Sequence, residues 1–192
     1  MKVKLNHQKP FLKKHTPSSI GTLKGEIYEN FIFEKLQLIY PYLEFISAKI
    51  PSKKIKNKNE NGFYYSKTGQ ILYFENKKII AEFDAIAISN KTIYLFEITR
   101  ISKKYKRYAI EKILRKYRLL KNIFPNYEVK LTIITPKRFS AFEKTGSKIL
   151  EIPEPNYENY YNIDFYNFND ALISNCSPIL TLNEIIKNLP KV

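Results

Sequence analysis

The sequence predicts one mixed α/β domain with a central sheet flanked by helices. In this sheet, an antiparallel meander is joined by a parallel strand after a crossover helix. Three observations predict it. A strongly apolar helical segment comes first, a run of strand-like segments with short turns follows, and an amphipathic helix then precedes a further buried strand. With 192 residues, 44% of them hydrophobic, the chain is long and apolar enough to form one domain with a buried hydrophobic core.

The N-terminal part is predicted to be an arm followed by a helix. Segment 1–17 is rich in lysine, and we expect a flexible basic arm. Ser18 and Ser19 are good N-cap residues, and apolar residues after them fall on two helical stripes. We therefore expect a well-buried helix that ends near Tyr40, because Pro41 cannot continue it.

Four strand-like runs follow a lysine-rich loop at 51–62. The turns between them are short, so 63–99 is predicted to be an antiparallel meander. A helix of about 20 residues and a buried strand before Pro136 come next, which usually form a parallel crossover. A capping box at Thr181–Glu184 predicts a short helix at 182–189.

These elements suggest how the chain is organised. We expect a core at 18–136 and a C-terminal extension of the same domain at 137–192, which is acidic and aromatic. No apolar run approaches the ~20 residues of a membrane span, and the start lacks the apolar part of a secretory signal. We therefore expect a cytoplasmic protein without a membrane-spanning part.

Other chemistries find little support in the sequence. Cys176 is the only cysteine, which excludes an intramolecular disulfide and metal sites built from several cysteines. His7 and His15 lie in the expected arm. A glycine-rich phosphate loop and a Ser-His-Asp arrangement are not recognisable.

The charge of the chain points to its partners. A net charge of +15 suits nucleic acid and, less well, an anionic membrane surface, although the lysines could mirror an AT-rich genome. Segment 100–121 has ten basic residues and one acid, whereas ordinary solvated faces mix both signs. Tyr105 and Tyr108 could stack on bases, but we expect them to pack. The side chains expected to hold a nucleic acid backbone are Lys103, Lys104, Arg107, Lys112, Arg115, Lys116 and Arg118.

The most hydrophobic stretch, EFDAIAISNKTIYLFEITR (82–100), contains two acids. It reads as two strands joined by a tight turn, with Asp84 in the first and Glu97 in the second. The faces of both strands are otherwise apolar, as in central strands covered on both sides. An ionised carboxylate buried there is costly unless it is paired or bound to a metal ion.

Two interpretations of these acids stay open. Each could pair with a nearby lysine or arginine, or lie near a strand end in water. Alternatively, both converge on a divalent cation, since Mg²⁺ prefers one or two carboxylates with water and phosphate oxygens. A cation held in this way can polarise a phosphate and neutralise a leaving oxygen.

Asp84, followed thirteen positions later by Glu97-Ile98-Thr99 on the next strand, resembles the core motif of the PD-(D/E)XK nucleases. This superfamily includes restriction endonucleases and archaeal Holliday-junction resolvases, and the order of elements over roughly the first 136 residues is similar to theirs. The resemblance implies a restriction endonuclease-like core and a nuclease acting on DNA. It further implies Mg²⁺ or Mn²⁺ held by Asp84, Glu97 and the backbone carbonyl of Ile98. Members are often dimers, so the resemblance leaves a homodimer open, and the sequence does not decide the oligomeric state.

A glutamate in the first helix often supports the metal site in this family. The segment GEIYE (25–29) resembles the family pattern of a glycine followed four positions later by that glutamate. The resemblance nominates Glu29, with Glu26 and Glu34 as rivals. The departure is Thr99, which stands where the family has a lysine that activates the attacking water and neutralises the scissile phosphate.

Three explanations of Thr99 stay open. A cation could reach in from the following helix, metal-bound water could suffice alone, or the protein could have lost catalysis and kept nucleic-acid binding. We favour the first, with Lys112 and Lys116 as the main catalytic candidates among Lys103, Lys104, Lys112, Arg115 and Lys116. A binder of anionic membranes or acidic proteins that uses charge alone is a further class, and it predicts no metal dependence.

Overall fold

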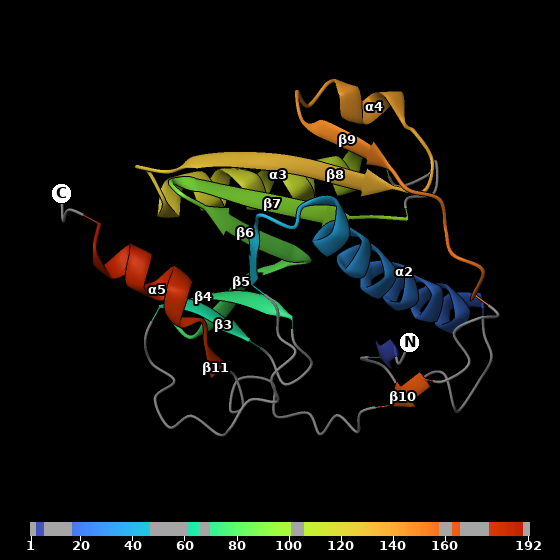
Figure 1. The fold of residues 1–192 in the computed structure, drawn as a ribbon, viewed down its shortest axis with the longest axis horizontal. Coiled ribbons are helices and arrows are strands. Elements are labelled where there is room, and N and C mark those ends of the chain that lie inside the picture. The colour runs from blue at the N-terminus through green and yellow to red at the C-terminus, as the bar shows by residue number, and fades with distance from the viewer. Residues whose placement is uncertain are drawn as a thin grey trace.

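The computed structural model describes residues 3–5, 17–46, 61–65, 70–100, 106–157, 163–165 and 177–189 (Figure 1). The elements in chain order are β1 (Val3–Leu5), α2 (Pro17–Ile39), β2 (Glu44–Ile46), β3 (Gly62–Tyr65), β4 (Ile71–Glu75), β5 (Lys78–Phe83), β6 (Ala85–Ser89), β7 (Thr92–Ile98), α3 (Lys106–Ile123), β8 (Glu128–Thr135), α4 (Ser140–Glu143), β9 (Lys148–Glu151), β10 (Ile163–Phe165), β11 (Ser177–Pro178) and α5 (Leu180–Lys187).

A five-stranded sheet, β2-β6-β7-β8-β9, forms the centre of the fold. Strands β2, β6 and β7 are antiparallel neighbours, whereas β8 and β9 continue the sheet in parallel with β7. Helix α3 connects β7 to β8, so the predicted parallel crossover is confirmed. The mixed sheet flanked by helices confirms the predicted α/β class. Figure 1 shows α2 in front of this sheet and α3 behind it.

Helix α2 covers one face of the five-stranded sheet. Tyr28, Ile32 and Leu36 are spaced by four residues and therefore lie on one side of the helix, where all three are fully buried. Near the end of the helix, Leu38 and Ile39 are exposed, so this end is less buried than its apolar sequence predicts. The buried side packs against a layer of small and large apolar residues from the sheet and the segment before it: Leu43, Ala85, Ala87, Phe96, Ile98 and Ile134.

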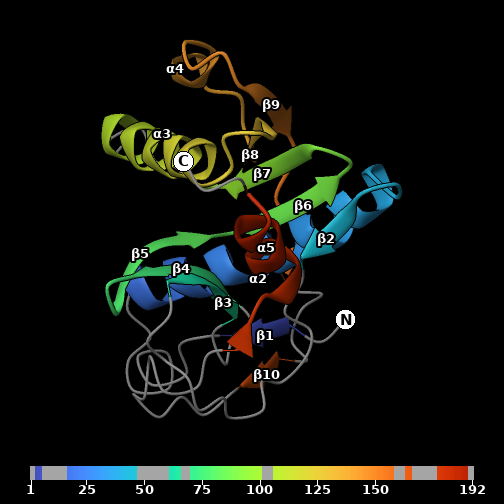
Figure 2. The same cartoon turned by 90° about the vertical axis from the view of Figure 1, so that its left-hand side faces the viewer.

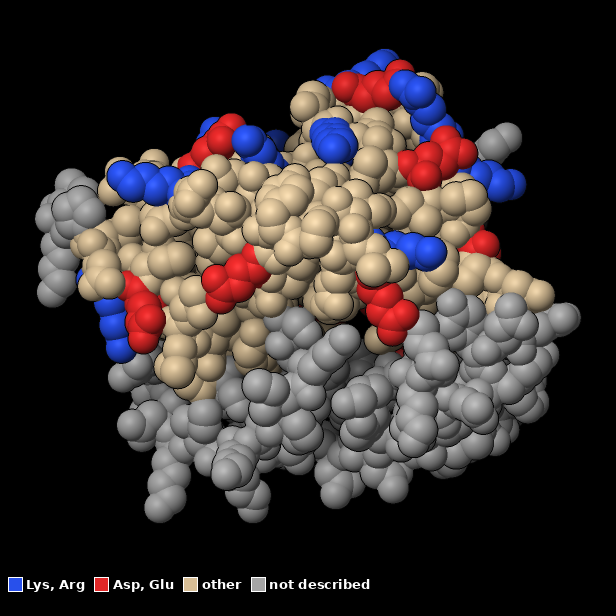
Figure 3. Space-filling model, viewed as in Figure 1, with Lys and Arg blue, Asp and Glu red and all other residues tan. Residues whose placement is uncertain are grey.

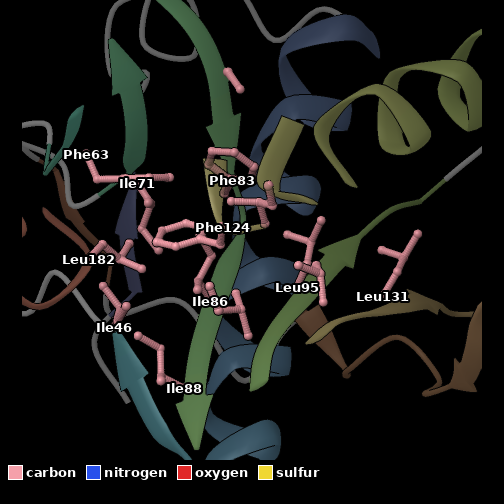
Figure 4. Close-up of a cluster of buried hydrophobic side chains, with 14 of the residues drawn as sticks. Ile46, Phe63, Ile71, Phe83, Ile86, Ile88, Leu95, Phe124, Leu131 and Leu182 are labelled. Atoms are coloured by element: carbon pink, nitrogen blue, oxygen red, sulfur yellow. The ribbon is translucent and has the colours of Figure 1, made fainter. Parts of the chain in front are cut away.

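Helix α3 covers the opposite face through the apolar stripe that its sequence predicts. Ile113, Leu120 and Phe124 are buried there. They belong to a large core shared with the five-stranded sheet, a second sheet and α5 (Figure 4). The labelled members of this core are Ile46, Phe63, Ile71, Phe83, Ile86, Ile88, Leu95, Phe124, Leu131 and Leu182.

The second sheet corrects the predicted meander. Its strand order is β11-β3-β4-β5, and it therefore contains β5, whereas β6 belongs to the five-stranded sheet. The chain passes from one sheet to the other at Asp84, which occupies a bend between Phe83 and Ala85. The sequence predicted Asp84 to lie inside a strand, and this prediction is wrong. Strands commonly turn the corner between packed sheets at such bends, and Figure 2 shows β5 beside β4 in one sheet and β6 beside β7 in the other.

Helix α5 begins earlier than the capping box predicts, at Leu180. Its N-cap is Ile179, which makes no side-chain cap. The side chain of Asn183, inside the predicted box, pairs instead with the edge of β3. Its Oδ1 accepts a hydrogen bond from the Phe63 N–H at 2.8 Å, and its Nδ2 donates to the Phe63 carbonyl at 2.9 Å. This contact anchors α5 to the second sheet.

The first described strand forms a small parallel pair with a strand from the C-terminal part of the sequence. Strand β1 pairs with β10 in a register that joins Val3 to Ile163, which the expectation of a flexible arm over 1–17 did not include. The rest of that segment before Pro17, and with it both histidines, lies outside the described residues. Among the described residues, no helix is long and apolar enough to cross a membrane.

Candidate active site

The strand register brings the two predicted acids together. Ala85 pairs with Phe96 and Ile86 with Leu95, so the next positions along this register are Asp84 and Glu97. Strand pairing stops there because the chain bends at Asp84. The Asp84 side chain replaces the lost strand partner, since its Oδ2 accepts a hydrogen bond from the Ile98 N–H at 2.7 Å. The bend therefore fixes Asp84 against the end of β7.

Glu97 is buried on the α3 side of the sheet. Alternation along β7 places it on the same face as Leu95, and only 3% of the residue is exposed. The Nζ atom of Lys116, from the middle of α3, lies 2.6 Å from Glu97 Oε2 and 3.9 Å from Asp84 Oδ1. A cation from the following helix thus reaches both acids. This is the first of the three explanations offered for the threonine at position 99.

The position of Lys116 also corrects the sequence analysis, which placed it on the exposed basic face of the helix. It lies three residues after Ile113 and four before Leu120, and this spacing puts it on the buried side. Only 5% of Lys116 is exposed. Lys116 therefore belongs to the group around Glu97 and not to the exposed basic surface of α3.

Glu97 Oε1 has an unmet need for a partner. It is buried, and no hydrogen-bond donor among the described residues reaches it. Lys116 alone accounts for a structural ion pair, but an oxygen left bare in the interior is costly. A hard divalent cation would satisfy it, and Asp84 and Glu97 supply the two carboxylates that Mg²⁺ or Mn²⁺ requires. The described residues contain no group of three or more His, Cys, Asp or Glu arranged for a metal ion. Water and phosphate oxygens would therefore complete the coordination.

The electrostatics of the site favour an added positive charge. Burial raises the pKa of Glu97 to about 8; the charge of Asp84 adds to this, while Lys116 and Lys112 oppose it. For Lys116, burial lowers the pKa, but Asp84 and Glu97 outweigh this effect and the pKa rises. The lysine thus stays charged, and the carboxyl group beside it binds a proton near neutral pH unless another cation is supplied.

Glu29 faces the same site from α2. Its side chain is exposed. Burial among the surrounding elements is the largest cause that raises its pKa well above the ordinary value, and the charges of Asp84, Glu26 and Glu82 follow, while Lys116 opposes them. Solvent contact weakens the effect of burial on this side chain. The repulsion by the other carboxylates is therefore the evidence that Glu29 belongs to the site. The rival Glu34 is exposed further along α2.

Glu82 is a member of this group that the sequence analysis did not nominate. Its charge acts on both Glu29 and Lys116, and its Oε1 accepts a hydrogen bond from Gln70 Nε2 at 2.7 Å. The sequence signal that could have nominated Glu82 is its spacing from Asp84, which follows two residues later. Residues two positions apart in an extended chain point the same way.

The remaining sequence candidates lie around the site or away from it. Thr99 is half-buried just after β7, and its N–H donates to the Ile134 carbonyl at 2.9 Å. Lys112 is exposed one turn before Lys116. Arg107, Arg115 and Arg118 are exposed on α3, whereas Lys103 and Lys104 lie outside the described residues.

Two details change the picture of the basic segment. Arg100 is committed within the protein, because its Nε pairs with Glu154 Oε1 at 2.8 Å and its guanidinium lies over the Tyr157 ring. Tyr108 does not pack as expected, since 72% of it is exposed. On the face of the molecule in Figure 3, basic and acidic side chains are interspersed, and α3 lies behind the sheet in this view. On α3 itself, Arg107 pairs with the acid of the segment, Glu111, at 3.2 Å.

Comparisons with protein-family models, with curated proteins and with solved structures gave no match. The resemblance to PD-(D/E)XK nucleases therefore stays a prediction that rests on the residue pattern.

Proposed function

We propose that the protein is a metal-dependent nuclease that hydrolyses phosphodiester bonds in DNA. The observation that carries this proposal is the position of Lys116 beside Asp84 and Glu97, where none of the described residues supplies a partner to Glu97 Oε1. Two carboxylates at the end of a sheet and one lysine fixed beside them by the covering helix are a compact set of groups for this chemistry. A purely structural ion pair accounts for the lysine but leaves the buried oxygen unexplained.

Each residue has a role that follows from its position. Asp84 and Glu97 would hold Mg²⁺ or Mn²⁺, with the Ile98 carbonyl and Glu29 in support, and the bound cation would polarise the scissile phosphate as a Lewis acid. The Ile98 N–H orients Asp84 through their hydrogen bond. Lys116 Nζ, already charged and fixed, neutralises negative charge as it develops on the phosphate oxygens. It supplies from the helix the charge that a threonine at position 99 lacks.

The exposed basic side chains of α3 would hold the DNA backbone. Lys112, Arg115 and Arg118 are exposed on the helix that carries Lys116 inward. Charges of this kind bind phosphates without reading sequence and make binding sensitive to salt. Binding and cleavage would thus use different sides of one helix.

The test is a cleavage assay on supercoiled and single-stranded DNA with Mg²⁺, Mn²⁺ or EDTA. Asp84→Asn and Glu97→Gln should each lower metal-dependent cleavage by at least about 100-fold while DNA binding persists. Glu128→Gln is the matched control, because Glu128 is an exposed acid at the start of β8 whose partners, Lys130 at 3.1 Å and the Thr92 hydroxyl at 3.4 Å, also lie at the surface. This variant should cut like the parent.

The same assay separates the other classes of function. If both site variants cut as well as the parent, the activity does not come from this site. A parent that binds DNA in a salt-dependent way but never cuts it is an inactive nucleic-acid-binding protein. A parent that neither binds nor cuts DNA would contradict both of these functions, and the binder of other anionic surfaces would be the class that remains.

A further inference from the structure

One aromatic side chain on the basic face of α3 is not explained by phosphate binding. Tyr108 is 72% exposed, and the structure records no ring contact or hydrogen bond for it among the described residues. A large apolar ring held in water contributes little to folding, since burial is what makes such rings stabilising. Lys112 and Arg115 are exposed on the same side of the helix, four and seven residues later.

Tyr108, Lys112 and Lys116 form a continuous ridge along α3. Residues four apart are neighbours on a helix, and each step advances by about 6 Å along its axis. Because this spacing also rotates slightly around the helix, the ridge moves from the solvent side to the core side. Tyr108 is strongly exposed, Lys112 is exposed, and Lys116 is buried against Glu97 and Asp84. The ridge therefore leads from the surface to the candidate active site.

The order of groups along this ridge matches one kind of ligand. A cation binds a phosphate of any nucleic acid, but an aromatic face binds a base only when that base is free to stack on it. Bases inside a duplex are stacked and paired, so a tyrosine on the surface gains little from them. Basic side chains interleaved with an aromatic ring are the combination found where single strands bind.

We infer that the ridge binds single-stranded DNA, with an unpaired base on the Tyr108 ring and the adjacent phosphate on Lys112, so that the backbone leads towards Lys116. This inference rests on the proposed function and makes it more specific, because it assigns unpaired DNA as the form that enters the site. Duplex DNA would meet only the positive charges.

The test measures binding in EDTA, where no cleavage occurs, with a single-stranded oligonucleotide and its duplex. Tyr108→Ala should weaken single-strand binding by between about 5-fold and about 100-fold, and Tyr108→Phe should restore it, because the ring rather than the hydroxyl stacks. Duplex binding should change by less than 2-fold. Tyr42→Ala is the matched control, since Tyr42 is also well exposed, at 66%, but lies beyond α2. It should leave both affinities unchanged.

Stacking has its own signature. A 2-aminopurine base placed along the oligonucleotide should be quenched at one position by the parent and by Tyr108→Phe, but not by Tyr108→Ala. Lys112→Ala should weaken both single strands and duplex and reduce the dependence on salt. An RNA oligonucleotide of the same sequence shows whether the ridge distinguishes the sugar.

The outcomes separate this inference from the proposed function. Equal effects of Tyr108→Ala on single strands and duplex, or no effect on either, would overturn the inference even if the parent cuts DNA with Mg²⁺. Stacking at Tyr108 in a protein that never cuts would support the inference and refute the nuclease. Polyglutamate that displaces DNA as effectively as an unlabelled oligonucleotide would point to an acidic protein partner and overturn it as well.

Discussion

The two faces of the five-stranded sheet are closed in different ways. On the α2 face the core is mostly apolar; it includes the hydroxyl-bearing residues Thr132 and Tyr28, and the Tyr28 hydroxyl donates to the Ile152 carbonyl at 2.6 Å. On the α3 face Glu97 and Lys116 interrupt the core, and one carboxylate oxygen of Glu97 has no hydrogen-bond partner in the described part of the chain. The comparison teaches that a buried polar group with a complete set of partners is structural, whereas an incomplete set points to something still to be bound.

The largest expected effect comes from removing the cation of the α3 face. Lys116→Met keeps the apolar stem of the side chain but removes its charge. We expect metal-dependent cleavage to fall by at least about 100-fold with DNA binding kept within a few-fold, because the charge acts mainly in the transition state. Single-turnover rates at saturating enzyme measure this directly. Lys112→Met should do the reverse, with weaker binding and an unchanged rate once DNA is bound.

Thr99→Lys sharpens the same point. Lys116 already supplies the cation, so a second lysine should be neutral or harmful to cleavage. If Thr99→Lys instead switched on a protein that is otherwise silent, then catalysis has been lost in the parent and Lys116 does not replace the family lysine. Cleavage rates of this variant beside those of the parent decide between the two.

Much of the fold follows from periodicity in the sequence. The apolar stripes of α2 and α3 and the strand on each side of α3 are strong signals, because burial imposes a period of two or near four on the chain. The meeting of Asp84 and Glu97 follows from the tight turn between β6 and β7. These features are local, so the sequence carries them directly.

Other features depend on contacts between distant segments. The run from 78 to 89 is mostly apolar and contains no Gly or Pro, so it reads as one long strand, and this hides the bend at Asp84. The start of α5 is set by the contact of Asn183 with β3, which no local pattern reveals. Lys116 differs, since its spacing from Ile113 and Leu120 already places it on the buried side. A lysine considered by its residue type alone is assigned to the exposed face of the helix, which is wrong for Lys116.

The next effect tests the apolar face. Leu36→Ala should lower the free energy of unfolding by about 2–5 kcal/mol, since Leu36 is fully buried and a cavity would remain. Cleavage per folded molecule should not change, because the side chain lies on the other face of the sheet from Lys116. Urea unfolding and an activity assay normalised to folded protein measure both. A loss of activity larger than the loss of folded protein would show that the two faces are coupled.

A smaller effect comes from the proton on Glu97. Its pKa rises from 4.5 to about 8 on folding, mainly through burial. Between these values the folded state holds a proton that the unfolded state has released, so this group makes stability fall as the pH rises. The parent should therefore lose stability relative to the Glu97→Gln variant as the pH rises, with both proteins free of metal. The difference between their free energies of unfolding should change by about 1 kcal/mol from pH 7 to pH 8. Unfolding in urea and EDTA at several pH values measures it, and parallel profiles would contradict the raised pKa.

The smallest effect on stability is expected on the exposed side of α3. Arg115→Ala should change the free energy of unfolding by less than about 0.5 kcal/mol, because the side chain is exposed and no partner fixes it among the described residues. If Arg115 meets a phosphate, its loss should nevertheless reduce the slope of log K on log salt by about 0.7 for single strands or about 0.9 for duplex. Arg138→Ala is the control, since Arg138 is also exposed but pairs with Glu143 at 2.8 Å, away from α3. An equal change of slope in both variants would mean that binding follows the net charge of the protein, and the exposed side of α3 would then be an ordinary solvated surface.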